Sequence, residues 1–245
     1  ADRIEALVEA CFQSEDYVEG RTAFKEKRTP QCNGKKKQMQ VTDRVCVVTG
    51  GGSGIGKALC ERFAADGARK VIVVDRAADN ATAVADAIGG DAEVVDVGDE
   101  AEITEMLLRV EDTYGPIDVL CNNAGIASGG NPLDTPVDEW QRQWDINVMS
   151  HVYAIRAVLP SMLTRGSGQI VCTTSVAGKY GSPMRSGYNA AKHAVHGVFD
   201  SLREEVAAAG IDVTLIVPGA GRTNVSINAL RGDGARYHRV DSFLD

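Results

Sequence analysis

The 245-residue sequence lacks a long apolar run and an excess of positive charge. No apolar segment approaches the ~18 residues that a membrane-spanning helix needs, so we expect no membrane partner. The 26 basic residues are outnumbered by 34 acidic residues, which gives a formal net charge of −8. Nucleic acid is therefore not expected as a partner, because its binding normally requires a basic surface.

Paired cysteines and metal-binding histidine patterns are also missing. None of the six cysteines forms a Cys-x-x-Cys motif, and Cys46, Cys121 and Cys172 fall in predicted strands. A free thiol in a strand acts as a small buried hydrophobic group. This usage is typical of a reducing compartment, so we expect a cytoplasmic protein. The four histidines have no ligand spacing with acidic neighbours, so we predict no metal site.

From residue 44 onward, short β-rich apolar runs alternate with helical patterns. The alternation predicts an α/β fold, a Rossmann-type doubly wound parallel sheet with helices on both faces. Residues 41–245 are enough for one such domain, and its ligand should lie at the carboxyl ends of the strands. We expect strands at 44–49, 70–75, 92–95, 117–121, 168–174 and 211–217, and helices at 54–66, 79–88, 99–113, 136–165 (with a break near Pro160) and 186–209.

The first strand leads into a glycine-rich turn and then a helix. Val45–Thr49 is apolar and β-rich, residues 50–56 contain five glycines, and residues 58–64 have a helical pattern. Glycine lets the backbone approach a pyrophosphate, and the N-terminus of the following helix attracts the anion. The order strand, turn, helix is the context of a dinucleotide fingerprint. We predict cofactor contacts from Gly50, Ser53, Gly54, Ile55 and Gly56.

The end of the second strand indicates which dinucleotide is bound. Asp75 falls about 20 residues beyond the glycines, where a carboxylate can accept hydrogen bonds from the adenosine ribose. A 2′-phosphate would be repelled there, which favours NAD over NADP. The neighbouring Arg76 argues the other way, because a guanidinium binds phosphate well. The glycine-rich turn has no basic residue, so NAD stays the preferred cofactor.

Tyr188 and Lys192 are four residues apart in a predicted helix and share one face of it. A phenol titrates near pH ~10 and is a weak base at neutral pH. A nearby ammonium favours the phenolate, which makes such a pair suitable for moving a proton to or from an alcohol oxygen.

Further motifs follow in a fixed order, and together residues 41 to about 232 resemble the short-chain dehydrogenase/reductase family. The resemblance covers about 190 residues, so it implies the fold and the chemistry of that family. The motifs are Thr49-Gly50-x-x-x-Gly54-x-Gly56, Asp96 after the third strand, Asn122-Asn123-Ala124-Gly125 after the fourth, and Pro218-Gly219 with Thr223.

The resemblance implies roles for individual residues. Tyr188 is the expected general acid/base, Ser175 the hydrogen-bonding partner of the substrate oxygen, and Lys192 the group that favours the phenolate and binds the nicotinamide ribose. Asn147 is expected to hold a water that links Lys192 to solvent. Alone, Ser175 would be interpreted as a loop cap, and Asn122 is as well explained by support of a strand end. The remaining expected cofactor contacts are Asp96, Val97, Asn123, Ala124, Gly125, Pro218, Gly219 and Thr223.

The two ends of the chain depart from the family. Residues 1–40 predict a helical extension and a basic linker, and residues 18–30 lie in a stretch of about 34 residues that resembles the C-terminal tail of enoyl-CoA hydratases (the crotonase family). That stretch lacks an oxyanion hole, so no hydratase activity is expected. After Thr223, residues 224–230 are compatible with a short lid helix, and no β-rich run follows. The family's usual last strand is therefore expected to be absent from the sheet.

The sequence as a whole predicts an NAD-dependent enzyme that interconverts a secondary alcohol and a ketone. One alternative is a catalytically impaired nucleotide-binding module. A second is an acyl-CoA-related (3-hydroxyacyl-CoA) dehydrogenase, which only the hydratase-like segment suggests. The family resemblance implies a homodimer or homotetramer, and we favour the dimer because the usual tetramer contact requires the last strand.

Overall fold

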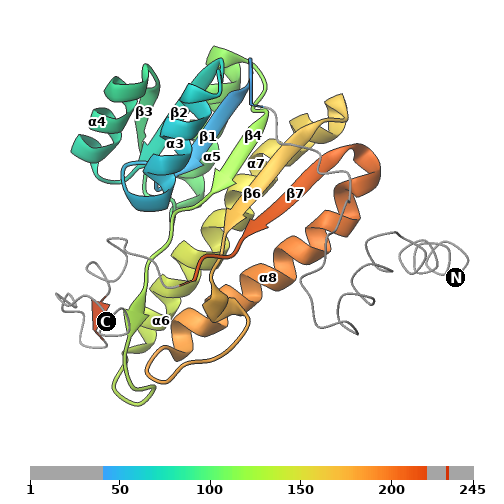
Figure 1. The fold of residues 1–245 in the computed structure, drawn as a ribbon. Helices are drawn as coiled ribbons and strands as arrows, with labels where there is room; N and C mark the ends of the chain where they lie inside the picture. Colours follow the sequence, from blue (N-terminus) through green and yellow to red (C-terminus); the bar gives the residue numbers. More distant parts are fainter. Residues whose placement is uncertain (1–40, 220–229, 232–245) are drawn as a thin grey trace, which may run out of the picture. The chain divides into compact units, whose positions relative to one another are not determined.

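The computed structural model of the chain describes residues 41–219 and 230–231. Its main sheet has six parallel strands in the order β3-β2-β1-β4-β6-β7 (Figure 1). The predicted fold class is confirmed, with strand boundaries within a few residues of those expected. The strands are β1 Val45–Thr49, β2 Lys70–Asp75, β3 Asp91–Val94, β4 Val119–Asn122, β6 Gly168–Thr173 and β7 Ile211–Ile216.

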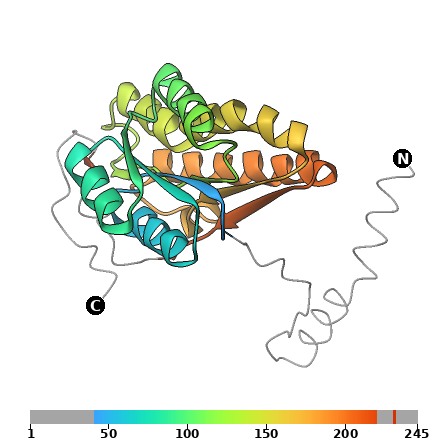
Figure 2. The ribbon, with the colours of Figure 1, turned by 90° about the horizontal axis from the view of Figure 1, so that it is seen from above.

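Helices cover both faces of this sheet. Figure 2 shows α5, α7 and α8 on one face and α3 and α4 on the other. Alternate strand residues contribute to the two resulting cores, because successive side chains of a strand point to opposite faces. Val45 and Val47 pack in the first core and Cys46 and Val48 in the second. The helices are α3 Gly54–Ala65, α4 Ala78–Ile88, α5 Glu100–Tyr114, α6 Val137–Trp144, α7 Ser150–Arg165 and α8 Ser186–Val206.

The long predicted helix at 136–165 is interrupted, but not at Pro160. Helix α7 runs through Pro160 to Arg165, so the expected break there is wrong. Proline has no backbone N–H, so Pro160 cannot donate a helical hydrogen bond to the Arg156 carbonyl. Both residues are exposed, so water can satisfy that carbonyl. The interruption is instead a π-helical turn at Asp145–Met149, between α6 and α7. Such turns are frequent at functional sites.

A second, two-stranded sheet was not expected from the sequence. Strand β5, Ser128–Gly129, pairs in parallel with β8, Leu230–Arg231. The lid helix predicted for 224–230 falls outside the described residues except at Leu230, which belongs to β8. In the described part of the chain, β7 is an edge strand of the main sheet. The predictions for residues 1–40 and for Thr223 also lie outside the described residues.

Two predicted absences can be compared with the described residues. Within 41–219 and 230–231, no helix is both long enough and apolar enough to cross a membrane. In the same ranges, no group of three or more His, Cys, Asp or Glu side chains is arranged to hold a metal ion.

His151, in the first turn of α7, should make stability depend on pH. Its ring is 1% exposed and meets Phe199 of α8 edge-on. Burial, with a smaller effect of the Lys192 charge, lowers the pKa of His151 to about 3. The unfolded chain binds a proton near pH ~6.5 and the folded chain does not, so stability from this group is complete above that pH. As the pH falls toward about 3, the free energy of unfolding should drop by about 1.4 kcal/mol per unit.

Urea unfolding between pH 7 and 5 measures this effect. His151→Gln should lose this part of the pH dependence, while the same change at the exposed His193 should keep it. Identical slopes for the wild type and His151→Gln would assign the pH dependence to other groups.

Candidate functional site

A cavity of about 740 Å³ opens at the carboxyl ends of the parallel strands. The chain reverses the direction of strand addition between β1 and β4, and ligands of open α/β sheets bind at such a switch point. The structure brings nearly all predicted site residues to this cavity, while Gly56 lies outside its lining. The predicted residues that line it are Gly50, Ser53, Gly54, Ile55, Asp75, Arg76, Asp96, Val97, Asn123, Ala124, Gly125, Asn147, Ser175, Tyr188, Lys192, Pro218 and Gly219.

The glycine-rich turn closes against the end of β4. Asn123 donates from Nδ2 to the Thr49 carbonyl at 3.0 Å and the Gly50 carbonyl at 3.4 Å. A Cβ at Gly56 would overlap the Gly50 carbonyl oxygen and stand 2.6 Å from Asn123 Nδ2. Gly56 therefore lets α3 approach the strand ends, a packing role beside the cavity.

The N-terminus of α3 offers an anion site. Ser53 is the N-cap residue, and its hydroxyl makes no capping hydrogen bond. The first amides of a helix have no partner within the helix, and they carry the positive end of its dipole. Because Ser53, Gly54 and Ile55 line the cavity, these amides lie where a phosphate group could bind.

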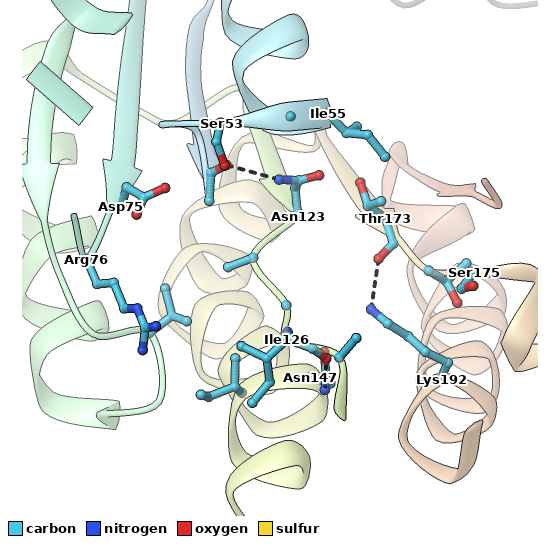
Figure 3. A pocket seen from close by; sticks show the side chains of 18 of the residues that line it. Ser53, Ile55, Asp75, Arg76, Asn123, Ile126, Asn147, Thr173, Ser175 and Lys192 are labelled. Atoms are coloured by element: carbon cyan, nitrogen blue, oxygen red, sulfur yellow. Dashed lines mark hydrogen bonds between the residues drawn. The ribbon is translucent and has the colours of Figure 1, made fainter. Parts of the chain in front are cut away.

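Asp75 ends β2 and supports the glycine-rich turn as well as lining the cavity. Its Oδ2 accepts a hydrogen bond from the Gly52 amide at 3.1 Å, and its Oδ1 accepts one from the Ala77 amide at 3.0 Å. Each carboxylate oxygen has a second lone-pair site for a ribose hydroxyl. Asp75 and Arg76 lie together at one end of the cavity, far from Ser175 and Lys192 at the other (Figure 3).

Asn147 lies in the π-helical turn rather than in the regular helix that was expected. Its side-chain amide is fully buried and holds the backbone of Ile126: Nδ2 donates to the Ile126 carbonyl at 2.9 Å, and Oδ1 accepts from the Ile126 amide at 3.1 Å. A Cβ at Gly125 would stand 2.9 Å from this Oδ1 and 3.5 Å from Lys192 Nζ. Asn147 therefore fixes the loop after β4 beside Lys192.

Tyr188 and Lys192 lie one turn apart on α8, as predicted. The Lys192 ammonium is 5.9 Å from the centre of the Tyr188 ring. Lys192 is 4% exposed, and its Nζ donates to the Thr173 carbonyl at 3.3 Å (Figure 3). An ammonium has three donors, so others stay available to a ligand in the cavity. The pair thus presents a phenol and a largely desolvated positive charge to one space.

Ser175 makes the capping contact that the sequence also allowed. It is the N-cap of the 3₁₀ turn Val176–Gly178, and its Oγ accepts a hydrogen bond from the Ala177 amide at 3.1 Å. This contact uses the hydroxyl as an acceptor, which leaves its proton free to donate into the cavity.

Several lining residues were not predicted: Ala77, Asn80, Val95, Ile126, Ala127, Arg142, Ile146, Thr173 and Thr174. Most adjoin a predicted residue or a strand end, so the rule that ligands bind at carboxyl ends of strands would have found them. Arg142 had no such signal. It lies on α6, pairs with Glu139 at 3.3 Å and is the second arginine of the cavity after Arg76. Asn122 was left open between two roles; it is buried at the end of β4 and does not line the cavity.

Comparisons with known proteins agree with this geometry. The family model for short chain dehydrogenases matches residues 44–233. Dehydrogenase/reductase SDR family member 7B of Danio rerio is 36% identical over 217 residues, which cover 84% of this chain and 70% of that protein. A short-chain dehydrogenase structure from Streptomyces avermitilis has a TM-score of 0.72 and 34% identity, covering 75% of this chain and 68% of that one.

A further solved structure carries a cofactor. The short chain dehydrogenase/reductase of Burkholderia phymatum, solved in complex with NAD, has a TM-score of 0.73 and 29% identity over 77% of this chain and 70% of that one. The chain spans 64% to 70% of the length of the first five curated relatives.

Proposed function

Because this chain belongs to the short-chain dehydrogenase family, we propose that it is an NAD-dependent oxidoreductase that interconverts a secondary alcohol and a ketone. The observation that carries the proposal is the set of groups that line one cavity. A phenol, a buried ammonium and a serine hydroxyl line one end, and a glycine-rich helix N-terminus and a carboxylate line the other.

The residues present fit a dinucleotide. A Cβ at Gly50, Gly52 or Gly56 would stand 2.9 Å or less from neighbouring protein atoms, so only glycine lets the turn pack this closely beside the cavity. The free amides of α3 suit the pyrophosphate, Asp75 suits the adenosine ribose, and Lys192 suits the nicotinamide ribose. Bound NAD would supply the group that accepts or donates a hydride.

The chain's own residues would transfer the proton of the substrate hydroxyl and stabilise the charge that develops on the substrate oxygen. In alcohol oxidation Tyr188 takes the hydroxyl proton, and in ketone reduction it returns that proton to the oxygen. Lys192 stabilises the phenolate form by its charge, which is little screened because the side chain is buried. Ser175 donates to the substrate oxygen and stabilises the negative charge that develops there.

A titration followed by a turnover screen tests this proposal. We expect NAD to bind, and we expect NADH to form with members of a panel of secondary alcohols. Binding without turnover across the panel would favour a nucleotide-binding module instead. Selective turnover of 3-hydroxyacyl-CoA substrates would favour the acyl-CoA-related alternative.

The carboxylate of Asp75 should set the preference between cofactors. Asp75→Ala removes the expected ribose contact and the repulsion of a 2′-phosphate, and it releases the amide of Gly52. We expect the Kd for NAD to rise about tenfold and the preference for NAD over NADP to narrow, as expected for loss of about 1.4 kcal/mol of binding. Calorimetric titration with both cofactors measures this. A stronger NAD preference in the variant would exclude the ribose contact.

A further inference from the structure

The short turn that carries Ser175 is held by a hydrogen bond to the segment after β7, by a hydrogen bond within the turn, and by packing against α8. The Val176 amide donates to the Pro218 carbonyl at 3.1 Å, and the Gly178 amide donates to the Ser175 carbonyl at 2.9 Å. The first contact fixes the turn to the segment that follows β7, and the second closes the turn on itself. Its third side faces α8, the helix that carries Tyr188 and Lys192.

On that side Gly178 lies directly against a histidine. A Cβ at Gly178 would overlap His196 Cδ2, and it would stand 2.9 Å from His196 Nε2 and 2.6 Å from the Lys192 carbonyl oxygen. His196 is one helical turn beyond Lys192 and only 6% exposed. Only a glycine lets the turn approach α8 this closely, so the histidine ring forms the surface against which the turn rests.

We propose that His196 is a positioning residue for Ser175, and that its ring, packed on Gly178, sets the distance between the serine hydroxyl and the Tyr188–Lys192 pair. The proposal rests on the proposed dehydrogenase function, because it assigns Ser175 to the substrate oxygen. A misplacement of a reacting group by about 1 Å can cost roughly a hundredfold in rate, so a support of this kind has kinetic consequences.

On balance, the surroundings of His196 favour the neutral form of its ring. Burial lowers the pKa of His196, and the charge of Lys179 beside the turn acts in the same direction, as does His193 on α8. The Ser175 backbone and the Asp200 carboxylate oppose this shift. Above pH ~6.5 a histidine with a lowered pKa is neutral, so the support is intact at neutral pH.

A double-mutant cycle between His196→Ala and Ser175→Ala tests the proposal through kcat for alcohol oxidation. His196→Ala should lower kcat about tenfold while the Kd for NADH changes by less than about twofold. In the Ser175→Ala background the same change should alter kcat by less than about twofold, because residues that act as one unit are not additive. Additive losses, or a matching loss of NADH binding, would overturn the assignment.

Two matched controls belong to this experiment. His193→Ala removes an exposed histidine of the same helix and should leave kcat unchanged. Gly178→Ala should lower kcat at least as much as His196→Ala, whereas Gly197→Ala, with no atom within 4 Å of the added Cβ, should not. Equal effects of the two glycine variants would contradict the contact.

A crystal structure of His196→Ala with NAD keeps the proposal testable without turnover. We expect Ser175 and its turn to shift relative to Tyr188, and an unmoved turn would overturn the proposal. If the wild type bound NADH but oxidised no alcohol, the dehydrogenase proposal alone would fail, and the position of the turn would still decide the role of His196.

Discussion

Tyr188→Phe should lower kcat for alcohol oxidation by about a hundredfold to ten-thousandfold, the contribution typical of a positioned general base. The change removes one oxygen atom and keeps the ring whose centre lies 5.9 Å from Lys192 Nζ. Tyr188 is expected to transfer a proton and to contribute little to the binding affinity for the dinucleotide. The Kd for NADH should therefore stay nearly unchanged, which fluorescence titration can measure.

Tyr180→Phe is the matched control for this experiment. Tyr180 lies in the loop before α8, is 59% exposed and does not line the cavity. Removal of its hydroxyl should leave both kcat and the Kd for NADH unchanged. If Tyr188→Phe instead weakened NADH binding as much as turnover, Tyr188 would be a binding residue and the proposed proton transfer would be wrong.

Gly56→Ala should weaken NADH binding by about tenfold to a hundredfold. The added methyl would overlap the Gly50 carbonyl oxygen and press on Asn123 Nδ2. The Gly50 carbonyl belongs to the backbone, and Asn123 Nδ2 is held by its hydrogen bonds to the Thr49 and Gly50 carbonyls. The glycine-rich turn must therefore move away from α3. Overpacking of this kind costs about 1–3 kcal/mol, part of which would appear as lost affinity because the turn forms the cofactor site.

Gly197→Ala separates this effect from a general effect of alanine. Position 197 lies on α8 in open space and should tolerate the same change without loss of affinity or stability. Calorimetric titration of both variants with NADH gives the comparison. Unchanged binding by Gly56→Ala would show that the turn does not hold the cofactor in the arrangement that we describe.

The sequence predicted those features that depend on local pattern. The run Val45–Thr49 before a glycine-rich turn specifies a buried strand and a helix start, whatever the rest of the chain does. Asp75 and Ser175 were expected at strand ends, and the alternation of strands and helices brings all strand ends to one edge of the sheet. The six strands and most of the site could therefore be found without coordinates.

The features that were missed depend on tertiary contacts. The π-helical turn around Asn147 has no characteristic amino-acid composition. The side-chain amide of Asn147 is hydrogen-bonded to Ile126, 21 residues earlier in the chain. A proline inside a helix usually interrupts it, but Pro160 is exposed and α7 continues through it. No local sequence pattern reveals that exposure. The pairing of β5 with β8 joins segments about a hundred residues apart, each only two residues long and without strand character.

Transfer of deuterium from a secondary alcohol, labelled on its carbinol carbon, to NAD⁺ is the most direct test of whether this cavity performs dehydrogenation. We predict that the wild type forms deuterated NADH with the label on the nicotinamide ring, and that Tyr188→Phe forms it at a much lower rate. If the wild type binds NAD⁺ but the ring gains no deuterium from any alcohol in a broad panel, the cavity does not carry out the proposed reaction.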